Sequence, residues 1–444
     1  MWIGVAGTLS NPLRDRIPGT GNWTAYAKPA GVTQWTPRPS FATYRNKTVI
    51  AGTFHPPVIY LDDIGTAGGG AAAWRKAGVE AVSNTPTVSA GGTGVMTGEL
   101  IVFLLFADYV GGVLYGRGNL SPPSATLSVT NRSIVVGNIP TTSADARVTH
   151  FEVYIGVGGD IPRMALRQAL GSSSVTINMS MTTLAASELA PFVVGPDGAL
   201  QVDLYARGIP PNGTFAVPFH YRIWYNDLDH PNRIWYTLPF EVDAVNNAAS
   251  DDDPENNTGY LTTKDGEAVT GAGRIGDTLL MFYYGGCYAI TGFGPGDFAV
   301  DKISSRFGCI SHHGIVAIGD ETLWFPSTDG VCMFNGGFQN LMANTQRDAW
   351  LADYAANQAK YENSIGVDNK RTNSYELLTT YGAPTRYWEG GYEPTMPGLG
   401  GQGGYPDWSH KKRARQDNCM AVLFDLGHQL GKIYTGSVDG FVRE

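Results

Sequence analysis

The sequence is poor in charged residues and in cysteine, and each shortage disfavours a class of protein. Only 16% of the 444 residues are charged, against about 25% in an average soluble protein. We therefore expect partner proteins to cover much of the outer face. The cysteines include no C-x-x-C pair, which argues against zinc or thiol-redox sites. We expect buried, inert thiols rather than disulfides or ligands at all four positions: Cys287, Cys309, Cys332 and Cys419.

Positive charge and long hydrophobic runs are also scarce. The formal net charge is -9, which disfavours a protein that grips nucleic acid by neutralising phosphates but is compatible with a wall past which nucleic acid slides. The longest apolar run, residues 100–107, is far shorter than the ~20 residues needed to cross a bilayer. The N-terminus has no signal-peptide pattern. We expect a soluble chain, made in a cytoplasm, without a membrane-spanning segment.

Glycine and aromatic residues are plentiful, with 57 glycines and 11% aromatics, and they suit short strands joined by tight turns. One pattern, a strand, a glycine turn and a second strand, occurs twice, at 276–292 and 319–336. The glycines that open the two copies, Gly276 and Gly319, are 43 residues apart. A strand-hairpin repeat of this length is typical of the blades of a β-propeller.

Hairpins of the same type are expected at six places along the chain. We therefore predict an all-β fold built on a six- or seven-bladed β-propeller. Because the chain ends inside the last hairpin, we expect a strand from the N-terminal segment to complete the final blade and close the ring. The six hairpins are expected at 45–61, 219–237, 277–290, 320–334, 364–379 and 420–442.

A segment of different character interrupts the blades. A small-residue linker at 65–73 precedes it, and its expected strands recur every 8 to 20 residues with Gly, Pro and Ser breaks. This spacing predicts an immunoglobulin- or fibronectin-like β-sandwich, inserted between the first and second blades. The predicted domains are 1–73, the first blade and ring closure; 74–190, the sandwich; and 191–444, the remaining blades.

Residues 344–361 are the one stretch with a helical pattern. The apolar face expected from the spacing contains Leu351, Tyr354, Ala355 and Ala359.

A G-x-G-x-x-G motif occurs at 271–276. A dinucleotide site needs a helix after this motif, whereas here a strand is expected at 277–283. We interpret the motif as a glycine loop between blades and predict no cofactor.

Two further groups resemble metal sites. His312 and His313 are adjacent, so on a strand they would point to opposite faces. The acidic run 251–255 lacks the ligand spacing of a calcium loop. We predict no metal and interpret both as loop or strand-end residues, with cation binding at the acidic run as the alternative. The Ser-x-Asp-Gly segments at 327–330 and 437–440 resemble half of a sialidase aspartate box, but the tryptophan that follows in that box is missing, and we interpret both segments as hairpin turns.

The only basic cluster consists of Lys411, Lys412, Arg413 and Arg415. It could contact DNA or an acidic partner surface, or it could be a solvated loop. The sequence contains no Ser/His/Asp trio and no paired-carboxylate motif, so we predict no catalytic residues and no enzyme.

Several segments resemble the β-propeller structural proteins of tailed bacteriophages, and most nearly the tail nozzle or tail-tube proteins of short-tailed phages. Segments of the expected insert resemble the fibronectin-type domains embedded in such proteins. The propeller segments are VPFHYRIWY (217–225), PNRIWY (231–236), GDTLLMF (276–282), ISSRFGCIS (303–311) and DGV (329–331); those of the insert are GELIVFLLFAD (98–108), LSPPS (120–124) and HFEVYI (150–155).

This resemblance implies a non-enzymatic virion protein. Its copies would form a ring of six around a channel through which viral DNA is ejected without sequence-specific binding. Other partners would be tail or neck proteins such as an adaptor or a tail fibre, and a neck adaptor, tail hub or tip ring is an alternative assignment. An acidic channel wall would repel the phosphates and keep DNA from sticking.

Two other functions compete with the virion hypothesis. One is a carbohydrate-binding or sialidase-like propeller that acts on host surface glycans, which would need a polar pocket at the propeller axis. The other is a propeller that binds a host receptor.

Overall fold

The computed structural model describes most of the chain, with gaps that concentrate near the two termini. The described residues are 2–4, 13–16, 23–26, 32–34, 39–45, 47–52, 54–61, 74–145, 147–194, 200–246, 258–319, 321–379, 385–392, 406, 408–413, 417–425, 428–437 and 442–443. Nearly all regular structure in these residues is antiparallel β-sheet, so the all-β prediction is confirmed. No helix among them is long and apolar enough to span a membrane.

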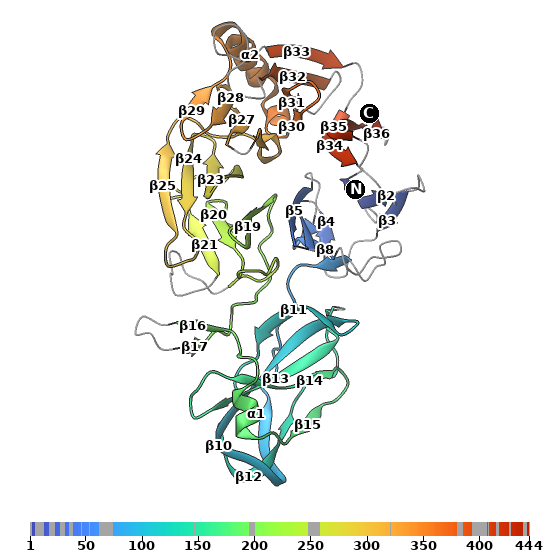
Figure 1. The fold of residues 1–444 in the computed structure, drawn as a ribbon, viewed down its shortest axis with the longest axis vertical. Helices are drawn as coiled ribbons and strands as arrows, with labels where there is room; N and C mark the ends of the chain where they lie inside the picture. Colours follow the sequence, from blue (N-terminus) through green and yellow to red (C-terminus); the bar gives the residue numbers. More distant parts are fainter. Residues whose placement is uncertain are drawn as a thin grey trace.

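Seven sheets of three or four strands follow one another in chain order around the upper part of the molecule in Figure 1. The first sheet contains β1 (Trp2–Gly4), β2 (Leu13–Arg16) and β3 (Trp23–Tyr26). The second contains β5 (Ser40–Tyr44), β6 (Lys47–Ala51), β8 (Val58–Leu61) and β9 (Trp74–Lys76). The third contains β18 (Ala216–Phe219), β19 (Arg222–Asn226), β20 (Arg233–Tyr236) and β21 (Gly259–Thr262). A short pair, β4 (Thr33–Gln34) and β7 (Phe54–His55), accompanies the second sheet.

The remaining four sheets have the same meander order. They are β22 (Gly271–Ile275), β23 (Thr278–Tyr283), β24 (Gly286–Thr291) and β25 (Ala299–Ser304); β26 (Val316–Ala317), β27 (Leu323–Ser327), β28 (Gly330–Phe334) and β29 (Phe338–Asn340); β30 (Ile365–Asn369), β31 (Ser374–Thr379), β32 (Thr385–Gly391) and β33 (Trp408–Arg413); and β34 (Asp417–Asp425), β35 (His428–Ser437) and β36 (Val442–Arg443). Each of the six hairpin segments expected from the sequence contains an antiparallel strand pair.

The first strands of successive sheets lie against one another. β5 contacts β18, β18 contacts β22, β22 contacts β26, β26 contacts β30, and β30 contacts β34. Large aromatic side chains fill the space between neighbouring sheets: Trp224 and Tyr236 meet Phe298 of the next sheet, and Phe282 meets Phe325. The sheets are therefore packed face to face in series.

The expected closure of the last sheet by an N-terminal strand is not observed among the described residues. β1, β2 and β3 pair with one another, and β34 to β36 form a separate sheet of three. The N-terminal strands thus form a sheet of their own, because each already has a partner within residues 2–26.

A second body, drawn in the lower half of Figure 1, contains one six-stranded sheet. Its strands are β10 (Thr87–Val110), β11 (Val113–Leu120), β12 (Leu127–Gly137), β13 (His150–Val157), β14 (Arg163–Ala169) and β15 (Ser174–Ile177). The short helix α1 (Met181–Ala185) packs beside it, and β16 (Phe192–Val194) pairs with β17 (Leu200–Val202).

The expected pair of separate sheets is in fact one continuous sheet, because β10 runs through both halves. The first half of β10 pairs with β12, and from Leu100 onward β10 pairs with β13. Alternate residues of its apolar centre face two different cores: Val102 and Leu104 lie in one, and Phe103 and Leu105 in the other. A strand buried on both faces explains why residues 100–107 are uniformly apolar.

The boundaries of this body differ from the predicted 74–190. β9 pairs with β8 of the second sheet, so residues 74–76 belong with the N-terminal strands. At the other end, Ala190, Val202 and Leu204 pack in a core of the second body. The packing therefore places the second body at about 79–206.

The expected helix is found with its predicted bounds, as α2 (Asn344–Tyr361), but its buried face is different. Leu351 is 37% exposed, whereas Trp350, Asp353 and Tyr361 are buried. Trp350 donates to the backbone oxygen of Ser327 at 3.2 Å, and the Tyr361 hydroxyl donates to Asp353 at 2.6 Å. The tryptophan and this buried hydrogen bond fix which side of the helix faces the sheets.

The G-x-G-x-x-G motif does not form a loop. Residues Gly271–Ile275 are strand β22, and Gly276 makes the turn into β23 with φ of 51°. A Cβ on Gly273 would lie 2.7 Å from Leu323 and 2.8 Å from Ile315. The glycines thus allow β22 to approach the neighbouring sheet closely.

Candidate functional site: a charged junction between the two bodies

The chain leaves the sheet of β9 and returns to β18 at almost the same point. Gly78 has a φ of 72°, and a Cβ on it would lie 2.7 Å from the Cα of Ile209. Close beyond, Gly208 exchanges two backbone hydrogen bonds with Val245 of the loop after β20. The second body is therefore attached through two adjacent chain segments.

The hairpin of β10 and β11 inserts an aromatic side chain beside this point. Tyr115 is buried in a core that also contains Leu61 of one sheet and Trp235 and Tyr260 of the next. Lys47 donates from its ammonium group to the backbone oxygen of Tyr115 at 3.0 Å. The hairpin thus contacts two successive sheets at once.

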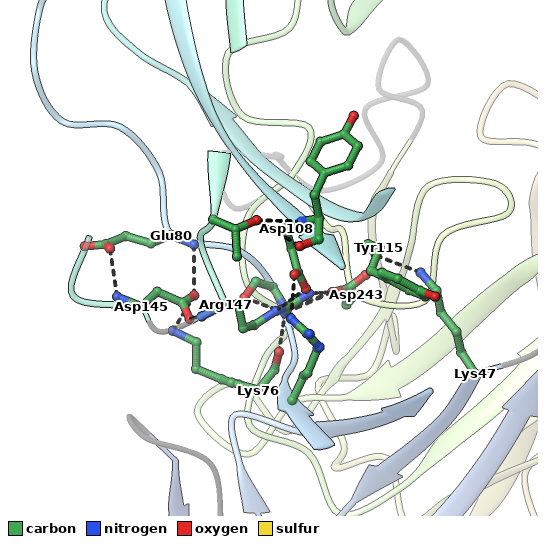
Figure 2. Close-up of polar contacts among 12 residues, drawn as sticks. Lys47, Lys76, Glu80, Asp108, Tyr115, Asp145, Arg147 and Asp243 are labelled. Atoms are coloured by element: carbon green, nitrogen blue, oxygen red, sulfur yellow. Dashed lines mark hydrogen bonds and ion pairs between the residues drawn. The ribbon is translucent and has the colours of Figure 1, made fainter. Parts of the chain in front are cut away.

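Four charged side chains occupy the centre of the attachment: Arg75, Asp108, Arg147 and Asp243, which we call the charged junction (Figure 2). Arg147, from the loop before β13, lies between the two carboxylates. Its Nε donates to Asp108 at 3.3 Å and its Nη2 to Asp243 at 3.2 Å. One guanidinium therefore links the second body to the loop that follows β20.

Arg147 also donates to backbone oxygens. Nη1 donates to the carbonyl of Lys76 and, at 3.0 Å, to that of Gly78. Asp243 in turn accepts from the backbone N–H of Gly78 at 3.2 Å. The connecting segment 76–78 is thereby held between an arginine of one body and an aspartate of the other.

Asp108 is fully buried, with 0% of its side chain exposed, and it accepts hydrogen bonds from Arg147 and from Arg75 of β9. Burial raises the pKa of the Asp108 carboxyl, and the guanidiniums of Arg147 and Arg75 oppose that rise. Since arginine stays charged in proteins, the two guanidiniums hold the carboxylate as an ion. A buried ion of this kind is tolerated only when it is fully paired.

A second group of polar contacts extends the junction toward its edge (Figure 2). Lys76 lies 3.4 Å from Asp145. Asp145 and Glu80 each accept from the other's backbone N–H at 3.3 Å, and the Ser143 hydroxyl donates to Glu80 at 2.5 Å. The loop that carries Arg147 is thus fixed just before the arginine, at Ser143 and Asp145.

A separate ionic cluster lies wholly within the second body. Glu152, which is buried, accepts from Arg117, Arg167, and the hydroxyls of Tyr109 and Tyr154 at 2.9 to 3.2 Å. Burial raises the pKa of Tyr109 to about 12, and the neighbouring Glu152 acts in the same direction. Both hydroxyls donate to Glu152, so this cluster joins strands β10, β11, β13 and β14 of the sheet.

The histidine pair expected at a loop or strand end lies in a 3-10 turn at His312–Gly314. The ring of His312 stacks on Phe215 at 4.1 Å, its Nε2 lies 3.4 Å from Ser40 Oγ, and its Nδ1 lies 3.4 Å from the backbone N of Ala272. Burial lowers the pKa of His312 well below its usual value. His312 therefore serves as a neutral contact between three sheets.

The three cysteines whose side chains are described, Cys287, Cys309 and Cys332, are buried free thiols, as expected from the sequence. Cys419 lies on β34, and its side chain is outside the described residues. Burial raises the pKa of Cys332 to about 12 and raises the pKa of Cys287 and Cys309. These thiols are packing residues. No group of three or more His, Cys, Asp or Glu among the described residues is placed to hold a metal ion.

The predicted basic cluster falls at the edge of the described chain. Lys411, Lys412 and Arg413 are on β33, opposite Tyr387, Arg386 and Thr385, but their side chains are not described, and Arg415 lies outside the described residues. The acidic run 251–255 also lies outside them. Asp329, in contrast, lies within the described residues. It is in the expected turn between β27 and β28 and accepts hydrogen bonds from Arg347 of α2.

Sequence reasoning missed the charged junction. One signal was present, since Asp108 and Glu152 are single acidic residues inside apolar strands, and a charge there requires a buried partner. Their partners could not be found in the same way, because Arg147 lies in a polar loop and Asp243 is 96 residues further along the chain.

No protein-family model and no curated protein matches this chain. Among solved structures, the chain is similar to BBS1N in its complex with ARL6DN, at 9% identity and a TM-score of 0.30, covering 70% of this chain and 85% of that one. It is also similar to the extracellular domain described as that of the one-component system BT4673 of B. thetaiotaomicron, at 13% identity and a TM-score of 0.30, covering 98% of this chain and 62% of that one. A third similarity is to the extracellular domain described as that of the hybrid two-component system BT3049 of B. thetaiotaomicron. The identity is 11% and the TM-score 0.26, and the match covers 98% of this chain and 53% of that one. These likenesses define no family.

Proposed function

We propose that this chain is a non-enzymatic structural protein of a bacteriophage tail. In this proposal the seven small sheets are the blades of a β-propeller and residues 79–206 are a module inserted between two of them. Copies assemble into a ring, expected to contain six, around a channel through which DNA leaves the virion. The sequence resemblance to phage tail propellers is the basis of the proposal, and the geometry of the sheets is compatible with it.

The charged junction is the observation that supports a structural role. A subunit of a channel wall must keep its domains in a fixed orientation while adjacent subunits exert force on it. Here Arg147 joins Asp108 and Asp243 across the two bodies, and Tyr115 of the same body is buried between two sheets. A buried, fully paired ion network is geometrically specific because any displacement leaves a charge unpaired. The arrangement favours a rigid building block over a hinge.

The order of contacts supports the propeller within this proposal. In a propeller, sheets stand radially and their innermost strands meet around the axis. The successive contacts from β5 through β18, β22, β26 and β30 to β34 follow that order. The sheet of β1 to β3 would then be a blade of its own, which makes seven.

The composition supports an assembled protein. A low charged fraction suits large buried interfaces, whose cores are depleted of charge, and an acidic balance suits a wall that DNA passes without binding.

The experiment is to purify the chain, measure its native mass and image it by electron microscopy. We expect a closed ring with a central channel wide enough for duplex DNA, and we expect mass spectrometry to find the protein in purified virions. A monomer that turns over a chromogenic glycoside, or virions without the protein, would contradict the proposal.

A further inference from the structure

Five side chains form a row on the surface across the turns of three successive sheets. Arg45 lies in the turn between β5 and β6, His220 and Tyr221 in the turn between β18 and β19, Phe240 in the loop after β20, and Phe293 after β24. The Arg45 guanidinium is 4.8 Å from the Phe240 ring, Phe240 is 5.2 Å from Tyr221, and His220 is 4.3 Å from Phe293. We call this set the aromatic row.

The rings of the row are open to solvent in the described structure. Tyr221 is 58%, Phe240 50% and Phe293 62% exposed. Such side chains elsewhere in this chain fill the spaces between sheets. Here Tyr221 and Phe240 lie side by side on the outside, and Phe293 contacts His220, the chain neighbour of Tyr221; an exposed apolar patch commonly marks an interaction site.

The backbone under the row is held in an unfavourable conformation. Arg45, His220, Tyr221 and Phe240 have φ values of 55°, 44°, 64° and 65°, in the left-handed region that side chains with a Cβ rarely adopt. A hydrogen bond of 2.7 Å from the Phe240 N–H to the Tyr221 oxygen fixes two of them. Arg45, His220 and Tyr221 lie in two-residue hairpin turns, which require a positive φ, whereas Phe240 holds this conformation outside a hairpin turn.

The adjoining loop is also fixed. The Asp297 carboxylate accepts from the N–H of Phe293 at 3.1 Å and from that of Gly294 at 2.7 Å, so Phe293 projects from a closed turn. The row is therefore preorganised, which lowers the entropy lost on binding.

The size of the row decides between a folded partner and a short segment. With about 200 Å² per aromatic ring and roughly half of each ring exposed, the row offers roughly 300 Å². A stable protein interface buries about 800 Å² on each side. The row is too small to hold a folded second copy by itself. Its three ring spacings total about 14 Å, roughly the length of four or five residues of polyproline II helix.

The chemistry of the row indicates which conformation and charge the bound segment should have. Its residues lie in turns, so the row offers no strand edge for β-pairing, whereas a polyproline II segment needs none and docks on aromatic faces. No acidic side chain among the described residues is within ion-pair distance of Arg45, so its charge can receive a carboxylate at one end of the row.

We propose that the aromatic row binds an extended, proline-rich segment of a partner protein that carries a carboxylate, with prolines on Phe240, Tyr221 and Phe293 and the acid on Arg45. This assignment stands on the row alone and does not depend on the tail hypothesis.

The test measures fluorescence anisotropy of the full chain with a labelled peptide of six prolines followed by two aspartates. The comparison peptides replace the aspartates by asparagines or the prolines by alternating glycine and serine. We expect saturable binding of the acidic proline peptide, weaker binding of the asparagine peptide, and none of the glycine-serine peptide.

The variants separate binding from folding. Phe240→Gly and Tyr221→Gly should weaken binding at least tenfold while the melting temperature stays the same or rises, because glycine accepts the left-handed backbone without strain. Phe293→Ser, at an exposed position, should also weaken binding. Arg45→Ala should lower the affinity for the aspartate peptide to that for the asparagine peptide. Tyr205→Ser removes an exposed tyrosine outside the row and should change nothing.

Absence of saturable binding, or equal affinity in Phe240→Gly, Phe293→Ser and the unaltered chain, would overturn the proposal. A glycan array in which a saccharide binds the unaltered chain and not Phe240→Gly would also overturn it, because the occupant would then be a sugar.

Discussion

The guanidinium of Arg147 lies 3.2 Å from the carboxylate of Asp243, although the two residues are 96 positions apart and belong to different bodies of the molecule. Neither side chain has much access to water, and Arg147 also contacts the buried Asp108. One arginine therefore links acidic residues of both bodies at the centre of their attachment.

Removing that arginine should be costly. We expect Arg147→Ala to lower the free energy of unfolding by about 3–5 kcal/mol, because Asp243 would remain buried without a counter-ion and Asp108 would keep only Arg75. Urea unfolding followed by tryptophan fluorescence measures the change. Lys302→Ala, which breaks an exposed ion pair with Asp265, is the control and should have little effect. A loss equally small for Arg147→Ala would show that the junction does not hold the bodies together.

The second body should fold by itself. The cores on both faces of β10 are closed within residues 79–204, so a fragment of residues 79–206 needs no surface from the rest of the chain. We expect cooperative thermal unfolding by circular dichroism. A fragment that stays unfolded under native conditions would place the boundary elsewhere.

Stability should fall in mild acid because of His312. Its pKa is lowered in the folded chain, so below about pH 6.5 the unfolded state takes up a proton that the folded state does not. The contribution of His312 is thus fully present above pH 6.5 and declines as the pH decreases, by at most about 1.4 kcal/mol per pH unit. Unfolding free energies at pH 7.5 and 5.5 measure this. His312→Gln should make the dependence shallower, and an unchanged slope would refute the assignment.

The buried thiols should not react in the folded protein. Burial raises the pKa of Cys287, Cys309 and Cys332, and the thiolate is the reactive form. We expect iodoacetamide at pH 8 to leave all three unmodified under native conditions and to label them in urea, as peptide mass spectrometry would show. Rapid labelling of Cys332 in the folded chain would contradict its placement between β27 and β29.

The hairpins could be predicted from the sequence because each carries its own signal. Apolar strands and a turn of the right type lie within 20 residues, as in the Ser327–Gly330 turn. The bounds of α2 were equally local. The buried face of α2 could not be predicted from local sequence. Hydropathy would place Asp353 in solvent, whereas it is buried and accepts a hydrogen bond from Tyr361.

Long-range features were beyond such reasoning. Strand β10 joins two half-sheets because it changes partner at Leu100, and no local pattern marks that residue. The same holds for the charged junction and the aromatic row, whose members meet only after the sheets have packed. Exposed Phe240 and Tyr221 look like core residues in a sequence.

The contact between Gly78 and Ile209 has a practical consequence for protein engineering. When the two ends of an insert touch, the surrounding fold pays almost no additional loop-closure entropy for its length. Any domain with neighbouring termini could then be grafted at this position, provided that Asp243 is neutralised or given a new cation. The position is thus a suitable attachment site for a fluorescent reporter.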